Sequence, residues 1–149
     1  MSGPAARVVV LDGDADLADV LRIRTVVFVK EQGVTPEEEI DGRDPSAVHL
    51  LATAEDGAPA GTCRLLGAGE PVARIGRMAV LAPARGSGIG ARLLAAAEEH
   101  LRAAGTAEVV LDAQLTARAF YERAGYRAEG GTFLDAGIEH VRMRKRLAG

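Results

Sequence analysis

A glycine-rich turn limits the possible folds of this chain more than any other feature. The turn Arg85-Gly86-Ser87-Gly88-Ile89-Gly90 joins a strand-like apolar run, ARIGRMAV, to a helix-like run, ARLLAAAEEHLRAAG. Glycines allow successive backbone N–H groups to converge on one anion, and the helix that follows directs its positive N-terminal dipole at the same place. The sequence therefore predicts a phosphate-binding turn between a strand and a helix.

A dinucleotide-binding turn is one interpretation of this pattern. Gly86 to Ala91 satisfies G-x-G-x-x-G/A, and a second strand-like run, EVVL, ends in Asp112 at about the distance expected of a ribose-binding acid. Against it, Leu81 to Arg85 separate the first strand from the turn, and only Ala91 to Gly149 follow, which is too short for a doubly wound sheet. Because the glycine spacing still matches, an NAD-dependent oxidoreductase stays an alternative function. A P-loop is excluded because no Gly-Lys-Ser/Thr ends the turn.

The chain resembles the GCN5-related N-acetyltransferases, whose R/Q-x-x-G-x-G/A signature is matched by Arg85, Gly88 and Gly90. The EVVLDAQ strand and the ARAFYERAGYR helix follow the signature in that family's order. The runs VFVKEQGV, EIDGRD, IGRMAV, FYERAGY and DAGIEHVRM are similar to the ElaA/YjcF-type branch of small bacterial acetyltransferases. The resemblance implies direct transfer of acetyl from acetyl-CoA to a primary amine of a small molecule or peptide. A non-catalytic acyl-CoA-binding regulatory module is the other alternative.

Composition limits the domain count and the partners. We expect one N-acetyltransferase domain over residues 1–149, because a chain of 149 residues buries one core comfortably. A net charge of -3 gives no general attraction to nucleic acid or to an anionic membrane. The only cysteine, Cys63, and three scattered histidines give no metal-site spacing, so no metal is expected. The apolar run Val8 to Leu11 is too short for a signal peptide or a membrane span, which predicts a cytoplasmic protein.

Hydrophobic periodicity and turn residues predict an α/β chain of alternating elements. The resemblance implies the acyl-CoA N-acyltransferase fold, a central mixed, mostly antiparallel sheet flanked by helices. It also implies that the central strands, 73–80 and 108–112, splay apart to receive the pantetheine arm, and Gly76 is a candidate bulge. The expected strands are 7–11, 48–54, 60–66, 73–80, 108–112 and two after Gly125, and the expected helices lie near 17–28, 36–39, 89–104 and 115–124.

The resemblance assigns the coenzyme contacts. The pyrophosphate would be held by the backbone N–H groups of Gly86, Ser87, Gly88, Ile89 and Gly90. Arg85 would add a charge-assisted hydrogen bond, unless the turn is only a helix start with Arg85 in solvent. Pantetheine would be bound by backbone groups of Met78, Ala79 and Val80, one of whose N–H groups would polarise the thioester carbonyl. Gln114 would bind pantetheine or substrate, or cap the next helix.

Acetyl transfer needs a proton donor for the leaving thiolate and a neutral amine. Tyr121 matches the family's acid, although its apolar helix face is also consistent with packing alone. For the base, His140, Glu31 and Asp135 are candidates, and loss of the amine proton to water is the alternative. A histidine titrates near neutral pH and so suits this role.

Residues 32–46 form a predicted loop, and a substrate-side lid is the functional interpretation. Its acids and Glu31 are offset within the segment only by Arg43, so a cationic acceptor would be attracted there, although a solvated charge run is an equally simple explanation. Arg77 would balance this loop or contact ligand. Cys63 is expected to be a strand or core thiol. Homodimers are common in the family, but no sequence feature selects an interface.

Overall fold

Seven strands form one mixed sheet in the computed structural model, which describes residues 7–147. Their spatial order is β1-β2-β3-β4-β5-β7-β6, and β4 and β5 are the one parallel pair within it. This arrangement confirms the predicted mixed, mostly antiparallel sheet. It differs from the parallel, doubly wound sheet that the dinucleotide-binding alternative requires. The strands are β1 (Arg7–Asp12), β2 (Val48–Thr53), β3 (Pro59–Leu66), β4 (Val72–Val80), β5 (Glu108–Gln114), β6 (Arg127–Asp135) and β7 (Ile138–Arg146).

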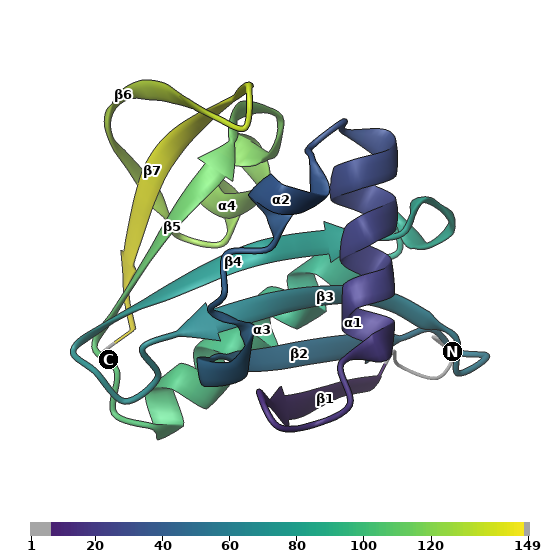
Figure 1. The fold of residues 1–149 in the computed structure, drawn as a ribbon. Coiled ribbons are helices and arrows are strands. Elements are labelled where there is room, and N and C mark those ends of the chain that lie inside the picture. Colours follow the sequence, from purple (N-terminus) through teal and green to yellow (C-terminus); the bar gives the residue numbers. More distant parts are fainter. Residues whose placement is uncertain (1–6, 148–149) are drawn as a thin grey trace.

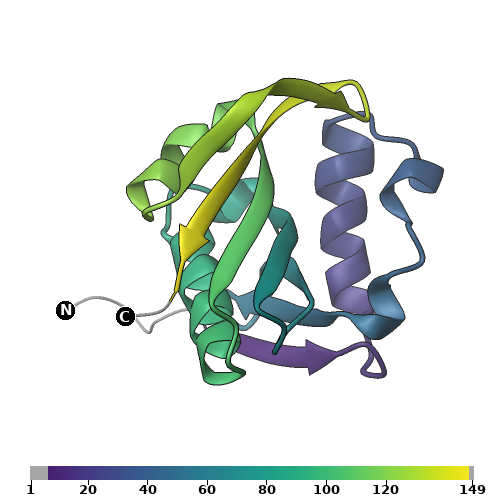
Figure 2. The same cartoon turned by 90° about the vertical axis from the view of Figure 1, so that its left-hand side faces the viewer.

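Helices cover both faces of the sheet (Figures 1 and 2). On one face lies α1 (Ala18–Arg24), which continues directly into a π-helical segment, Thr25–Glu31, and α3 (Ile89–Ala103) and α4 (Arg118–Arg123) lie on the other. The short α2 (Pro36–Glu39) has the predicted bounds and follows a capping box. Short 3-10 turns span Asp44–Ser46, Ala82–Ala84 and Leu115–Ala117. Within residues 7–147, none of the helices is both long and apolar enough to cross a membrane.

The main hydrophobic core lies between the sheet and α3. The buried face of α3 consists of the apolar residues at helical spacing, among them Leu93, Leu94 and Leu101. Gly61 on β3 allows this helix to approach closely, because a Cβ there would lie 3.0 Å from a Leu93 methyl group. Truncating a fully buried leucine such as Leu93 to alanine costs about 2–5 kcal/mol. This packing fixes the N-terminal end of α3, and with it the glycine-rich turn.

The central strands β4 and β5 separate after a short pairing. Their register covers only Val72–Arg74 with Glu108–Val110, and the ribbons then diverge (Figure 1). This confirms the predicted splay. From Ile75 to Val80, β4 has no paired strand on its β5 side. Backbone groups left without a strand partner need hydrogen bonds from water or from a ligand, so the wedge is the natural place for a bound chain.

A bulge interrupts β4 at the wide part of the wedge. In the register with β3, Arg77 and Met78 together stand opposite the single residue Cys63. The predicted bulge position was therefore wrong by one residue, since Gly76 pairs normally with Arg64. Arg77 itself has a φ of +52°, a left-handed value that is unusual for a residue other than glycine. Gly76 was predicted because glycine tolerates unusual backbone conformations, whereas in the structure Arg77 adopts the strained conformation.

The extra residue reverses which way the following side chains face. Before the bulge, Ala73 and Ile75 belong to the core on the α3 side. After it, Met78 and Val80 pack against that core, while Ala79 packs with residues of α1. An uninterrupted strand would have placed Ala79 on the α3 side, because successive side chains alternate. The bulge therefore sets the orientation of the strand end that lies beside the glycine-rich turn.

Candidate active site

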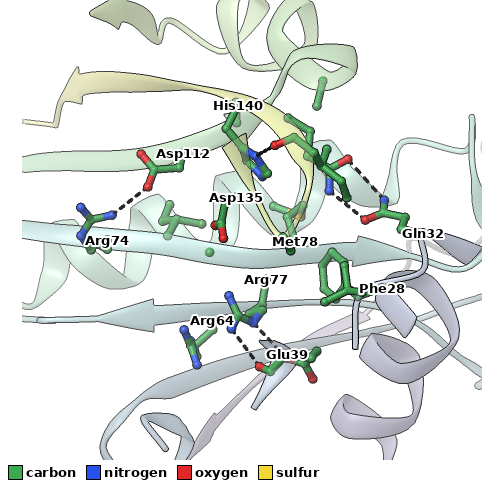
Figure 3. Close-up of a pocket in the computed structure, with 18 of the residues that line it drawn as sticks. Phe28, Gln32, Glu39, Arg64, Arg74, Arg77, Met78, Asp112, Asp135 and His140 are labelled. Carbon is green, nitrogen blue, oxygen red and sulfur yellow. Dashed lines mark hydrogen bonds and ion pairs between the residues drawn. The ribbon is translucent and has the colours of Figure 1, made fainter. Parts of the chain in front are cut away.

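A pocket of about 480 Å³ opens where β4 and β5 separate (Figure 3). The π-helical end of α1, α2, β4, β5 and the turn between β6 and β7 all contribute to its walls. The structure brings a set of sequence-predicted site residues together here: Met78, Gln114, Tyr121, Asp135 and His140. The π-helical turn beside it, where Gln32 N–H donates to Val27 O at 3.2 Å, is a local widening of a kind often found at functional sites.

The glycine-rich turn has the geometry of an anion cradle. Gly86 and Gly88 have φ values of +80° and +88°, and a Cβ at either position would meet nothing within 4 Å. The backbone N–H groups of Gly86 and Gly88–Ala91 have no hydrogen-bond acceptor among residues 7–147. They lie at the N-terminus of α3, a helix of 15 residues, whose dipole adds to their positive potential. The turn can therefore offer several converging donors to one negatively charged group.

Arg85 does not point along this cradle. Its Nε donates to the Val80 carbonyl at 2.9 Å, and its Nη2 donates to the Glu31 carboxylate. Glu31 is consequently held outside the pocket, away from the other candidate bases. Both side chains are partly exposed, at 47% and 35%, so the pair contributes little and can rearrange at low cost.

Tyr121 lies at the base of the pocket, on α4. It is 6% exposed and packs edge-to-face against Phe120 and Tyr126, with ring centroids 5.0 and 5.8 Å apart. Burial raises the pKa of its phenol above the usual value, with a smaller contribution from Cys63. Within the described part of the chain, its hydroxyl has no hydrogen-bond partner. The group is thus a protonated donor with a free O–H at neutral pH.

His140 reaches the opposite wall of the pocket from β7. Its Nδ1 lies 2.7 Å from the Ile138 carbonyl, which accepts a hydrogen bond from Nδ1–H when the neutral ring carries its proton on that nitrogen. The remaining nitrogen, Nε2, then carries a lone pair that can accept a proton. The ring stacks on Phe133 with a centroid separation of 5.9 Å and is 9% exposed. Of the predicted bases, Asp135 also lines the pocket, whereas Glu31 does not.

Gln114 forms a contact that sequence reasoning did not find. Its amide exchanges hydrogen bonds with the amide of Gln32, at 2.9 and 3.3 Å, and so joins the end of β5 to the end of the π-helical segment. The predicted alternative, a cap on the following helix, is wrong, because no side chain caps the turn Leu115–Ala117. No local signal could reveal Gln32 as the partner, since 82 residues separate the two glutamines.

The acidic loop is neutralised by arginines that are distant in sequence. We call the following set the ion-pair ring: Arg24 contacts Glu39 (2.6 Å) and Asp44 (2.9 Å), Arg64 contacts Asp41 (2.7 Å) and Asp44 (3.2 Å), and Arg77 contacts Glu39 (2.9 Å) and Asp41 (3.4 Å). The predicted balancing role of Arg77 is confirmed, and Arg24 and Arg64 are further partners of these acids that the sequence analysis did not name. Figure 3 shows Arg77 and Glu39 facing each other below the pocket.

Two carboxylates of the ion-pair ring have shifted titrations. The hydrogen bond from Arg64 holds the pKa of Asp41 well below its usual range. Burial opposes ionisation of Asp44, but hydrogen bonds and charge from Arg24 and Arg64 outweigh it and lower the pKa of that carboxyl. Both groups are therefore ionised at neutral pH, and the loop is attached firmly to the sheet.

Cys63 is a core thiol, as expected. It is 1% exposed, and burial raises its pKa to about 12, so it is not an available nucleophile. In the part of the chain that the structure describes, no group of three or more His, Cys, Asp and Glu side chains is placed to hold a metal ion.

Comparison with known proteins gives one consistent result. A family model described as an acetyltransferase (GNAT) domain matches residues 24–147. The uncharacterized N-acetyltransferase YjcF of Bacillus subtilis is 34% identical over 141 residues, which cover 93% of this chain and 99% of that protein. The crystal structure of an acyl-CoA N-acyltransferase from Pseudomonas aeruginosa superposes with a TM-score of 0.82 and 32% identity, covering 95% of this chain and 99% of the other. Escherichia coli ElaA gives a TM-score of 0.81 and 25% identity, with 95% and 99% covered.

Proposed function

Because the chain belongs to the acetyltransferase (GNAT) family, we propose that it transfers acetyl from acetyl-CoA directly to a primary amine of a small molecule or peptide. The observation that carries this proposal is the row of unbonded backbone N–H groups at the start of α3, beside a strand whose edge is open to a ligand. A pyrophosphate followed by an extended amide-containing arm matches both features. The residues present therefore fit coenzyme A.

The coenzyme contacts follow from this placement. The free amides of Gly86, Gly88, Ile89 and Gly90 would hold the pyrophosphate, and the Ser87 amide would join them on leaving the Ala84 carbonyl, to which it donates at 3.4 Å. The open edge of Met78, Ala79 and Val80 would bind the pantetheine arm as an added strand. Gln114 would hydrogen-bond the same arm once its amide leaves Gln32. Arg85 would contribute to phosphate binding only after release from Glu31. When bound, acetyl-CoA supplies an activated thioester carbonyl.

The pocket residues supply the proton transfers. Tyr121, with its unbonded hydroxyl, would donate a proton to the leaving thiolate. His140 is the better placed base, since its Nε2 is the free nitrogen of a ring that lines the pocket, and Glu31 is held away by Arg85. Asp135 is the second candidate on geometry. A backbone N–H of β4 near the bulge would stabilise the charge that develops on the carbonyl oxygen.

The acceptor would enter by the pocket of Figure 3. Glu38 and Asp135 line it and have no arginine or lysine partner within residues 7–147, in contrast to the carboxylates of the ion-pair ring. They would favour an acceptor with a second positive charge. Location in the cytoplasm and formation of a homodimer stay predictions. Cell fractionation would test the first, and gel filtration would test the second.

The first test is thermal stabilisation by acetyl-CoA, coenzyme A and NAD, measured side by side. A ligand selective for the native state raises stability by RT ln(1 + [L]/Kd). We expect stabilisation by the two coenzyme A ligands and none by NAD. Stabilisation by NAD alone would overturn the proposal. Stabilisation by acetyl-CoA without thiol release in the presence of a panel of primary amines would instead indicate a non-catalytic acyl-CoA-binding module.

A further inference from the structure

The bulge in β4 is held in a strained shape by a residue outside the sheet. We propose that Glu39 is a positioning residue, which acts through Arg77 to hold the bulge so that the Met78 region presents a backbone N–H to the thioester carbonyl. This inference rests on the proposed function. It adds a residue from α2 to which that scheme gave no role.

Arg77 bears the strain. Its φ of +52° is a left-handed conformation that is costly for any residue with a Cβ and persists only where surrounding contacts enforce it. Two contacts with Glu39 do so: Nε donates to the carboxylate at 2.9 Å, and Nη2 donates to the backbone carbonyl at 2.8 Å. The Arg77 side chain is therefore held mainly by Glu39, and its contact with Asp41 is longer, at 3.4 Å.

Glu39 is itself held from the opposite side. Its carboxylate, 5% exposed, accepts from Arg24 Nη2 at 2.6 Å and from Arg24 Nε at 3.1 Å. Arg24 is fully buried at the end of α1, so the carboxylate bridges a helix to the bulge. The capping box of Thr35 and Glu38 fixes the start of the short helix that carries Glu39. The bulge is thus supported by α1 and α2, which lie outside the sheet.

Removing the Glu39 charge has a defined consequence. The ion-pair ring would keep three arginines against two carboxylates, and Arg77 would lose the Glu39 carboxylate that restrains it, keeping only the longer contact with Asp41 at 3.4 Å. Without that restraint, residue 77 can relax to an ordinary strand conformation, which moves the neighbouring amide. Replacing Arg77 by glycine removes the strain at its source, because glycine adopts a positive φ readily. Glu39→Gln combined with Arg77→Gly also balances the ring again, with two arginines against two carboxylates.

The test uses coenzyme A and acetyl-CoA labelled with 13C at the acetyl carbonyl. Isotope-edited infrared difference spectra report the thioester C=O stretch, which falls when an N–H polarises the carbonyl, and calorimetry with coenzyme A reports the cradle. We expect the bound wild-type stretch to lie below that of free acetyl-CoA. In Glu39→Gln it should shift toward the free value while coenzyme A affinity changes by less than about twofold. Glu37→Gln is the matched control, because Glu37 is an exposed neighbour whose side chain makes no hydrogen bond or ion pair within residues 7–147.

Glycine variants keep the test decisive if Glu39→Gln folds poorly. Arg77→Gly and Arg77→Ala both remove the guanidinium, but only alanine keeps the strain. We expect the wild-type stretch in Arg77→Gly and in the double variant Glu39→Gln/Arg77→Gly, and a free-like stretch in Arg77→Ala.

Four results would separate the inference from the function it rests on. An unshifted stretch in Glu39→Gln, or equal stretches in Arg77→Gly and Arg77→Ala, would overturn the positioning role. If the wild-type protein binds acetyl-CoA but does not lower the frequency of the thioester C=O stretch, the positioning role would also be overturned. The anion-binding role of the glycine-rich turn would not be affected by that result. A wild-type protein that binds neither coenzyme A nor acetyl-CoA would refute the proposed function itself.

Discussion

Gly88 allows the anion cradle to be tested against a control within the same helix. Gly88 precedes α3 with a φ of +88°, and Gly105 follows the other end with a φ of +95°. A Cβ added at either position meets nothing within 4 Å, so the two sites differ in location and not in crowding. We compare Gly88→Asp with Gly105→Asp.

The backbone cost should be the same at the two sites, but the dipole of α3 should make Gly105→Asp the less stable variant, because a carboxylate is favoured at the N-terminus of a helix and disfavoured at its C-terminus by about 0.3–1 kcal/mol each. A left-handed residue with a Cβ costs about 1–2 kcal/mol, and in a domain of this size each kcal/mol lowers the Tm by about 2–4 °C. Coenzyme binding should separate them. A carboxylate at residue 88 would lie where the unbonded amides converge, and it would repel the negatively charged pyrophosphate. Loss of two hydrogen bonds to a charged phosphate, at about 1.5–3 kcal/mol each, corresponds to a hundredfold weaker affinity or more.

Differential scanning fluorimetry measures the Tm of both variants, and isothermal titration calorimetry measures their affinity for coenzyme A. We expect the Tm of Gly105→Asp to lie below that of Gly88→Asp by a few degrees, about 2–4 °C per kcal/mol, with near-wild-type coenzyme A affinity in Gly105→Asp and no measurable binding in Gly88→Asp. If Gly88→Asp binds coenzyme A within tenfold of Gly105→Asp, the amides of this turn do not hold the pyrophosphate, and the reasoning is refuted.

Four further predictions concern the pocket and its surroundings. Tyr121→Phe should keep its Tm and coenzyme A affinity, because the hydroxyl makes no hydrogen bond in residues 7–147, but should lower kcat about a hundredfold or more; unchanged turnover removes the acid. His140→Gln should lower kcat about a hundredfold or more while coenzyme A affinity is kept, because the variant lacks the ring nitrogen that would accept the amine proton; an unchanged rate would point to Asp135. The pKa values of Asp41 and Asp44 are lowered in the folded protein. The stability that these ionised carboxylates give the fold is therefore complete above their unfolded pKa of 3.8 and is lost as the pH falls below it; a Tm constant from pH 5 to pH 2.5 would contradict this. Cys63 should not react with Ellman's reagent until urea unfolds the chain, and fast native labelling would contradict its burial.

Local patterns predicted most of the elements in this chain. The bounds of α2 follow from Thr35, Pro36 and Glu38, which form a cap that is complete within four residues. Gly105 marks the end of α3 because a left-handed position after a helix favours glycine. Both features depend on neighbours in sequence. Their physical causes therefore lie within a few residues of each feature in the sequence.

Features that depend on distant partners were not predictable in the same way. The ion-pair ring joins α1, the acidic loop, β3 and β4, and no local pattern shows that Arg24 or Arg64 is buried. Gln32 and Gln114 meet only because the wedge brings two strand and helix ends together. The bulge was predicted at Gly76 from flexibility, but contacts with Glu39 impose it on Arg77. Predictable and unpredictable features of this chain therefore differ in how far apart in sequence the interacting residues lie.

The bulge also makes this part of the chain sensitive to its length. Val80 faces α3 only because one extra residue follows Ile75, and its methyl group lies 3.9 Å from the Cβ position of Gly90. Deleting one residue between Ile75 and Ala79 would exchange the directions of the last two side chains and remove the support of the glycine-rich turn. Substitutions in this segment should therefore be easier to accommodate than single-residue insertions or deletions. Engineers who transplant or shorten β4 need to count its residues before choosing their identities.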